Sequence, residues 1–113
     1  MITVYAYVLD TLADWEMGYV IAELKSGRFF KKGAERVEFK TVGYSTDPIL
    51  TMGGMKVAPD CAVGDIVASG AAGSANVLLL PGADTWADPR HGAILGKARE
   101  LLDAGGTVCA ICG

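Results

Sequence analysis

Short runs of apolar and β-branched residues recur along the chain, and each run predicts a buried strand. The longer runs cover residues 2–9, 37–42, 76–80 and 107–111. After Asn76, the run 76–80 is apolar, which is typical of a central strand in a parallel sheet, because both faces of such a strand are covered. Two shorter runs, 49–52 and 55–58, flank Gly53 and Gly54. They predict a small hairpin, because paired glycines permit the positive φ angles of a tight turn.

Two further segments place apolar residues at helical spacing. The first predicted helix covers residues 15–30, with Asp14 as its N-cap. Its expected core face consists of Met17, Val20, Ile21 and Leu24. The second helix begins at Asp88 and Pro89 and ends at Gly105. Its expected core face consists of Ile94, Leu95, Ala98, Leu101 and Leu102. The small residues of 65–74 predict no particular element.

The alternation of strands and helices predicts an α/β fold with a parallel sheet covered by helices on both faces. Ligands of such sheets bind at the carboxyl ends of the strands. Three segments with candidate chemistry lie at predicted strand ends, namely 14–16, 81–83 and 112–113. We expect these segments to meet if their strands are neighbours in the sheet.

Composition and charge exclude several classes of protein. A chain of 113 residues is one domain or part of one, and its net charge of -3 argues against nucleic-acid and anionic-membrane partners. No apolar run reaches the roughly 18 residues of a membrane span. The first ten residues lack the features of a signal peptide, and three cysteines cannot all pair. We therefore expect a cytoplasmic protein that needs no metal or other cofactor.

Cys109 and Cys112 form a Cys-x-x-Cys pair within the segment TVCAICG. Because Gly105 and Gly106 break the preceding helix, this segment is expected to be a strand. Cysteines three apart on a strand lie about 10 Å apart at their Cα atoms, and a disulfide needs less than about 7 Å. No second pair of metal ligands accompanies them. We therefore interpret Cys109 as a small buried hydrophobic residue, rather than as half of a redox or metal pair.

Cys112 falls at the tip of the predicted strand, directly before Gly113. A residue at a sharp strand-to-helix turn exposes its side chain, and the N-terminus of a following helix would stabilise a thiolate there. A buried cysteine before an ordinary loop fits the local sequence equally well. Cys61 follows the predicted hairpin and is interpreted as a packing residue.

Four segments together resemble the ThiJ/PfpI superfamily, which has the class I glutamine amidotransferase-like fold. They are LADWE (12–16), TMGGMKVAPD (51–60), VLLLPGAD (77–84) and VCAICG (108–113). Their order and spacing match along essentially the whole chain. The resemblance implies a flavodoxin-like three-layer α/β sandwich with a parallel central sheet.

The resemblance also implies roles for individual residues. The family's nucleophilic cysteine matches Cys112, and the acidic residue that hydrogen-bonds its sulfur matches Glu16. Backbone amides of a Pro-Gly-Gly turn help to form the family's oxyanion site. Gly82 matches the first glycine, and Ala83 stands where the family has the second. The amide of Gly113 would be the other donor. A carboxyl beside a thiolate should be protonated, because two adjacent negative charges repel.

Other residues near these positions allow simpler interpretations. Glu16 could merely favour the first turn of a helix through the helix dipole. His91 is expected to be a solvated surface residue in the first turn of its helix. Trp15 and Trp86 lie at loop–helix junctions, where they could line a pocket or pack in the core.

The family's remaining strands, and its histidine where one is present, would follow Gly113. We therefore expect residues 1–113 to be the N-terminal part of a single ThiJ/PfpI-like domain. The C-terminal half of the same protein would then complete the sheet, and the resemblance implies a homo-oligomer, most simply a dimer.

Two functions follow from the resemblance. The first is a cysteine-dependent hydrolase that acts on an amide, a peptide or a small carbonyl compound, including glyoxalase- or deglycase-like chemistry. The second is a non-enzymatic redox sensor or stress-response protein that uses an oxidisable cysteine. A nucleotide-binding domain is disfavoured, because the loop DTLAD (10–14) contains no glycine to cradle a phosphate.

Overall fold

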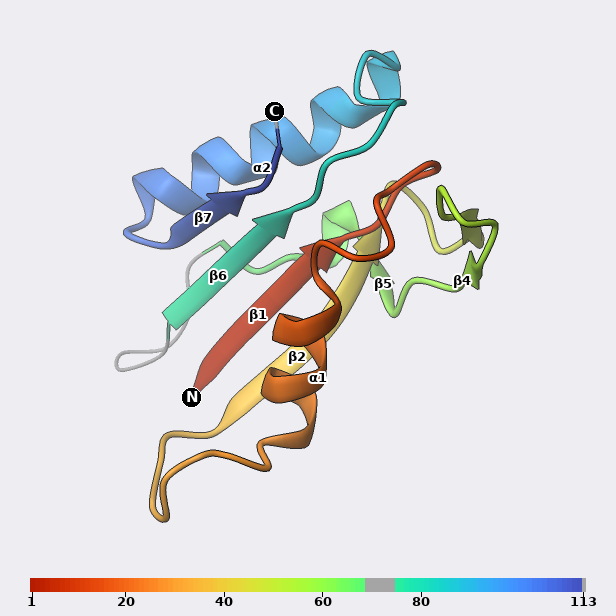
Figure 1. The fold of residues 1–113 in the computed structure, drawn as a ribbon. Coiled ribbons are helices and arrows are strands. Elements are labelled where there is room, and N and C mark those ends of the chain that lie inside the picture. The colour runs from red at the N-terminus through yellow and green to blue at the C-terminus, as the bar shows by residue number, and fades with distance from the viewer. Residues whose placement is uncertain (69–74, 113) are drawn as a thin grey trace.

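The computed structural model describes residues 1–68 and 75–112 (Figure 1). The strands are β1 (Ile2–Tyr7), β2 (Val37–Gly43), β3 (Ile49–Leu50), β4 (Lys56–Val57), β5 (Cys61–Ala62), β6 (Ala75–Leu80) and β7 (Thr107–Ala110). The helices are α1 (Gly18–Ser26) and α2 (Gly92–Asp103), with short 3₁₀ helices η1 (Val63–Asp65) and η2 (Pro89–His91). Five strands form a parallel sheet in the order β5-β2-β1-β6-β7.

The arrangement confirms the predicted α/β fold. β1 pairs with β2 on one side and with β6 on the other, and β7 extends the sheet beyond β6. The apolar run 76–80 is therefore an internal parallel strand, as predicted. β3 and β4 form the predicted antiparallel hairpin around Gly53 and Gly54. Residues 69–74, which the sequence left open, lie outside the described residues.

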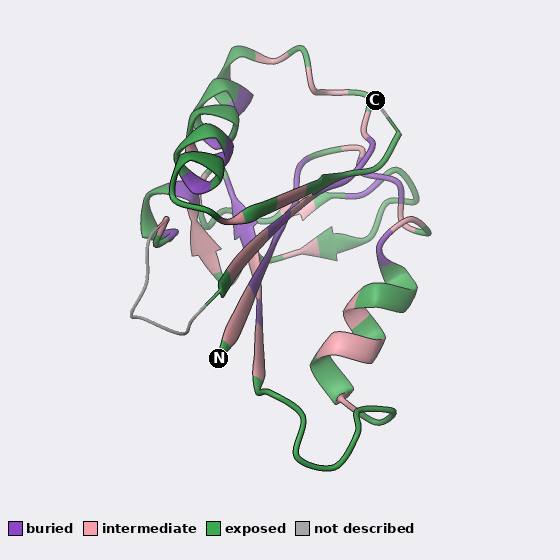
Figure 2. Ribbon diagram, turned by 90° about the vertical axis from the view of Figure 1, so that its left-hand side faces the viewer, coloured by how far each residue is buried: buried purple, intermediate pink, exposed green. Residues whose placement is uncertain are grey.

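Helices cover both faces of the sheet (Figures 1 and 2). The alternation of side chains along β1 decides which face each residue joins. Tyr5 and Tyr7 pack with the buried residues of α2, whereas Val4 and Ala6 pack with Met17 and the inner side of α1. The core on the α2 side is the larger of the two. The described helices are too short to cross a bilayer, and none has the apolar character that crossing requires.

The first helix is shorter than predicted. It begins at Gly18 and ends at Ser26, because Gly27 adopts the left-handed conformation (φ 61°) that terminates helices. Asp14 is not its N-cap, since its carboxylate binds the hairpin instead. Val20 was wrongly placed on the core face and is exposed, because α1 covers the sheet only with Ile21, Leu24 and the preceding Met17.

The second helix starts as predicted. The Asp88 carboxylate accepts a hydrogen bond from the Arg90 N–H (3.0 Å), and η2 leads directly into α2. Gly105 has φ 84° just after the helix end, which confirms its capping role. Two residues of the expected core face, Leu95 and Leu102, are exposed and were wrongly assigned, because the narrow buried stripe of α2 holds only Ile94, Ala98 and Leu101.

The prediction that Cys109 is buried is wrong. Cys109 lies in β7 opposite Leu79, on the face that α1 covers elsewhere. β7 is the last strand of the described sheet, and α1 packs over β1 and β2 at some distance from it (Figure 2). The Cys109 side chain is therefore exposed. Cys61 is half-buried, and its thiol contacts the Thr41 carbonyl, which agrees with the packing interpretation.

Candidate functional site

The carboxyl ends of β1, β6 and β7 are neighbours, and the segments that follow them enclose a cleft of about 440 Å³. The cleft is lined by Ala13, Trp15, Glu16, Met52, Gly82, Ala83, Asp84 and Cys112. The structure thus brings together the candidate segments from the three strand ends. Met52 was not among the predicted site residues.

Cys112 has an unusual backbone conformation. Its φ angle is 50°, in the left-handed region that residues with a Cβ rarely adopt. The hydrogen bond from the Ile111 N–H to the Leu80 carbonyl (3.0 Å) continues the pairing of β7 with β6, and the chain turns immediately afterwards. Strain of this kind costs about 1–3 kcal/mol and clusters at functional positions. The turn leaves the Cys112 side chain exposed at the cleft.

Glu16 lies in the turn before α1 and not in the first turn of the helix. Because α1 begins at Gly18, the first turn of the helix contains no acidic residue. Glu16 Oε1 instead accepts a hydrogen bond from the Gly82 N–H (2.8 Å), and the Gly82 carbonyl accepts one from the Ala13 N–H (3.0 Å). These two reciprocal bonds fix the turn after β1 against the turn after β6. The helix-dipole interpretation of Glu16 therefore fails.

Gly82 is the point where the three segments approach most closely. A Cβ on Gly82 would lie 2.7 Å from Glu16 Oε1 and 3.0 Å from the Cys112 Cβ. Real Cβ atoms do not approach a neighbour at the first distance, and the second is very tight. A glycine at this position therefore allows the carboxyl and the cysteine to share one small space.

The Glu16 carboxylate raises the pKa of the Cys112 thiol above its ordinary value. It does so first by accepting a hydrogen bond from the thiol, and second through its negative charge. The Cys112 thiol is therefore harder to ionise beside this carboxylate than it would be alone.

The backbone amides near Cys112 are not equivalent. The Gly82 N–H donates to Glu16, while the Ala83 N–H has no acceptor among the described residues. Ala83 is absent from the described non-glycine residues with positive φ, so its Cβ causes no backbone strain there. Gly113, the other expected donor, lies outside the described residues.

The two tryptophans occupy different positions at the site. Trp15 lines the cleft and is 68% exposed. Trp86 is half-buried, and its Nε1–H donates to the Pro81 carbonyl (2.8 Å), directly before Gly82. It also lines a shallow apolar depression of about 130 Å³ on the α2 side of Cys112. Trp86 therefore both packs in the core and supports the turn after β6.

The prediction that His91 is solvated is wrong. His91 is only 4% exposed, and its Nδ1 lies 2.7 Å from the Tyr7 hydroxyl. The rings of Tyr7, Trp86 and His91 form a cluster with centroids 5.3–5.6 Å apart. Burial lowers the pKa of His91 and raises the pKa of Tyr7 to about 12. The η2 turn directs His91 inward, and no local pattern indicated this long-range partner.

The sequence analysis also did not predict that the Asp14 side chain binds the hairpin of β3 and β4. The Asp14 carboxylate accepts hydrogen bonds from the Thr51 hydroxyl (2.5 Å) and the Gly53 N–H (2.8 Å). These bonds lower the pKa of Asp14. They hold the tip of the hairpin beside the cleft and so place Met52 in its wall. Among residues 1–68 and 75–112, no three His, Cys, Asp or Glu side chains gather closely enough to hold a metal ion.

Known proteins share the sequence pattern and the fold of this chain. The sequence model of the DJ-1/PfpI family matches residues 2–113. The uncharacterized protease YoaZ of Bacillus subtilis (strain 168) is 43% identical over 110 residues, which are 97% of this chain and 50% of YoaZ. A solved thiJ/pfpI family protein from Bacillus anthracis is 40% identical with a TM-score of 0.89, covering 100% of this chain and 52% of that one.

A solved DJ-1 superfamily protein from Agrobacterium tumefaciens shares the fold at 24% identity. Its TM-score is 0.77, over 99% of this chain and 54% of that one. The chain thus spans about half the length of the relatives that it matches.

Proposed function

The chain belongs to the DJ-1/PfpI family, and from this premise we propose that it is a cysteine-dependent hydrolase with Cys112 as its nucleophile. Its substrate would be an amide, a peptide or a small carbonyl compound. The observation that carries the proposal is the strained Cys112, which lies with the Glu16 carboxylate against Gly82. The name of YoaZ as a protease agrees with this reaction class.

The proposed reaction uses Glu16 twice, first as a base and then as an acid. Glu16 accepts the thiol proton as the Cys112 sulfur attacks the carbonyl carbon and forms a tetrahedral oxyanion. The Ala83 N–H, which has no acceptor among the described residues, would donate to this oxyanion, joined by the Gly113 amide. The C–N bond then breaks, and the protonated Glu16 gives its proton to the leaving amine. Water hydrolyses the resulting thioester and restores the thiol.

The Gly82 amide has a different role in this proposal from the one expected from sequence. Its N–H holds the Glu16 carboxylate at 2.8 Å, so it orients the acid. It could bind the oxyanion only after Glu16 released it. Trp15 and Met52 would contact the substrate from the rim of the cleft, and Trp86 would support the turn that carries Gly82.

The half-length coverage of the relatives supports a further part of the proposal. We propose that residues 1–113 form the N-terminal part of one DJ-1/PfpI-like domain, completed by the C-terminal half of the same protein. We also propose that the protein works as a cytoplasmic homodimer. Size-exclusion chromatography with light scattering would test the dimer.

A matched pair of cysteine variants tests the hydrolase. Cys112→Ser should lower turnover of peptide and amide substrates by roughly a thousandfold or more, because the alcohol is a far weaker nucleophile here. Cys109→Ser, which changes an exposed thiol three residues before Cys112, should leave turnover within about twofold. Equal activity in the two variants would refute the proposal.

The exposure of the Cys112 thiol favours a second candidate function, namely redox sensing. Two equivalents of hydrogen peroxide would oxidise the thiol to a sulfinic acid and release water. A protonated Glu16 could then donate a hydrogen bond to the sulfinate. Mass spectrometry after peroxide treatment should show oxidation of Cys112 ahead of Cys109. Equal oxidation of these two exposed thiols would contradict this role.

A further inference from the structure

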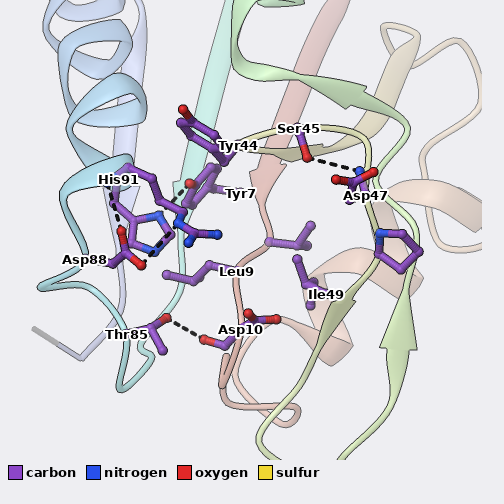
Figure 3. A pocket seen from close by; sticks show the side chains of 13 residues that line it. Tyr7, Leu9, Asp10, Tyr44, Ser45, Asp47, Ile49, Thr85, Asp88 and His91 are labelled. Atoms are coloured by element: carbon purple, nitrogen blue, oxygen red, sulfur yellow. Dashed lines mark hydrogen bonds and ion pairs between the residues drawn. The ribbon is translucent and has the colours of Figure 1, made fainter.

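A second pocket lies at the carboxyl ends of β1 and β2 (Figure 3). Its volume is about 150 Å³, and it shares no lining residue with the Cys112 cleft. Its walls come from the end of β1, the segment between β2 and β3, and the segment that leads into α2. The proposed hydrolase reaction uses none of these lining residues.

One wall of this pocket presents a buried imidazole. Tyr7 keeps its proton, and its hydroxyl has His91 Nδ1 as its partner among the described residues. A phenol in this position donates to Nδ1, which places the imidazole proton on Nε2. Nε2 has no hydrogen-bond partner among the described residues, and no described side-chain nitrogen or oxygen is both buried and unpaired. Nε2 therefore keeps some access to solvent, and His91 is one of the residues that line the pocket.

Arg90, the residue before His91, adds a positive charge to the lining of the pocket. Its Nε binds the Asp88 carboxylate (3.1 Å), and its guanidinium lies over the Tyr44 ring at 5.8 Å. These contacts fix the plane of the guanidinium. Its two terminal amino groups have no acceptor among the described residues and remain available to a ligand. Arginine and a neutral imidazole N–H are suitable donors for a carboxylate.

The floor and the opposite wall are acidic. Asp47 lies across the pocket from His91, and Asp10 lies at its floor (Figure 3). One oxygen of Asp10 accepts the Leu50 N–H (2.9 Å), and no described residue pairs ionically with Asp10 or Asp47. Apart from Asp88, which is paired with Arg90, the acidic groups therefore lie on other walls of the pocket than the His91 imidazole. A ligand with a carboxylate at one end and an ammonium group at the other would match both sides.

We propose that this pocket binds a small zwitterion of the free amino acid class. Its carboxylate would contact Arg90 and His91, and its ammonium group would contact Asp47 and Asp10. The volume is about five times the roughly 30 Å³ that one water molecule occupies in the liquid, which suits a ligand of this size. Three aspartates, Asp10, Asp47 and Asp88, and one arginine line the pocket, so the lining has a net negative charge. An ammonium group alone should therefore bind better than a carboxylate alone.

Isothermal titration calorimetry of the purified protein tests this proposal with three matched probes. L-alanine carries both charges, propionate lacks the ammonium group, and ethylamine lacks the carboxylate. L-alanine should bind saturably, and the other two should bind roughly tenfold or more weakly, with propionate the weakest. Absence of L-alanine binding up to roughly 50 mM would overturn the proposal, since even small ligands reach millimolar affinity in matched sites.

Matched variants locate the binding. Arg90→Gln and Asp47→Asn should each weaken L-alanine binding by roughly tenfold or more. Arg99→Gln and Asp103→Asn remove the same charges from exposed positions of α2 that do not line the pocket, and should change binding less than twofold. Equal effects of the pocket and control variants would overturn the proposal. Cys112→Ser should leave the binding unchanged, so the result does not depend on the hydrolase reaction.

Discussion

The ends of β7 and β1 lie on the same edge of one sheet, and they differ in almost every physical property. At the end of β7, Cys112 is exposed, strained at φ 50° and coupled to the negative charge of Glu16. At the end of β1, Tyr7 is fully buried and hydrogen-bonded to His91 without backbone strain. The comparison suggests that the β1 end is a rigid support and that the β7 end holds the reactive group.

The largest expected effect comes from adding one carbon at Gly82. Gly82→Ala forces the new Cβ against Glu16 and Cys112, and the displacement should lower the proposed turnover by roughly a hundredfold. Gly96→Ala is the control, because a Cβ there meets no neighbour within 4 Å and α2 should gain about 0.4–1 kcal/mol. Steady-state kinetics and urea unfolding measure both variants. Wild-type turnover in Gly82→Ala would show that the close approach has no function.

The second-largest effect is expected at the end of β1, where Tyr7 is hydrogen-bonded to His91. Tyr7→Phe removes the hydroxyl and leaves the buried His91 Nδ1 without a partner, which should cost about 1–3 kcal/mol of unfolding free energy. Urea denaturation measures this loss. The alkylation rate of Cys112 in the folded variant should stay within about twofold of wild type. A larger change in that rate would contradict the proposal that Tyr7 is a structural support and that the reactivity of Cys112 does not depend on it.

A smaller effect is expected from the hydrogen bonds between the Asp14 carboxylate and the hairpin of β3 and β4. The hydrogen bonds from Thr51 and Gly53 lower the pKa of Asp14 in the folded state, so their contribution to stability is present above the unfolded value of about 3.9. This contribution to stability should be lost as the pH falls through the lower pKa that Asp14 has in the folded state. Asp14→Asn should flatten this part of the stability profile, measured by thermal unfolding between about pH 2 and 5. An unchanged slope in the variant would contradict the assignment.

The sequence predicted the elements better than it predicted the contacts between them. The apolar runs located the strands of the parallel sheet, because a buried strand is recognisable from its own residues. The burial of His91 depends on Tyr7, which lies 84 positions away, and the position of Met52 depends on the bond between Asp14 and Thr51. Periodicity carries no information about such pairs.

Two of the errors have the same physical origin. Cys109 and Leu95 were expected to be buried because their strand and helix are apolar, yet both side chains are exposed. Burial depends on what covers each face of the sheet and of α2, and neither the composition nor the spacing of the local residues states this. The candidate site was easier to predict, because the segments around Glu16, Gly82 and Cys112 match a family pattern in order and spacing.

The central claim is that the Glu16 carboxylate acts directly on the Cys112 thiol. The most direct test is the pH dependence of Cys112 alkylation by iodoacetamide, measured by mass spectrometry in the wild type and in Glu16→Gln. Because the carboxylate raises the pKa of the thiol, Glu16→Gln should move the alkylation profile to lower pH, while the profile of Cys109 stays in place as an internal control. An unchanged Cys112 profile, or one displaced to higher pH, would contradict the account.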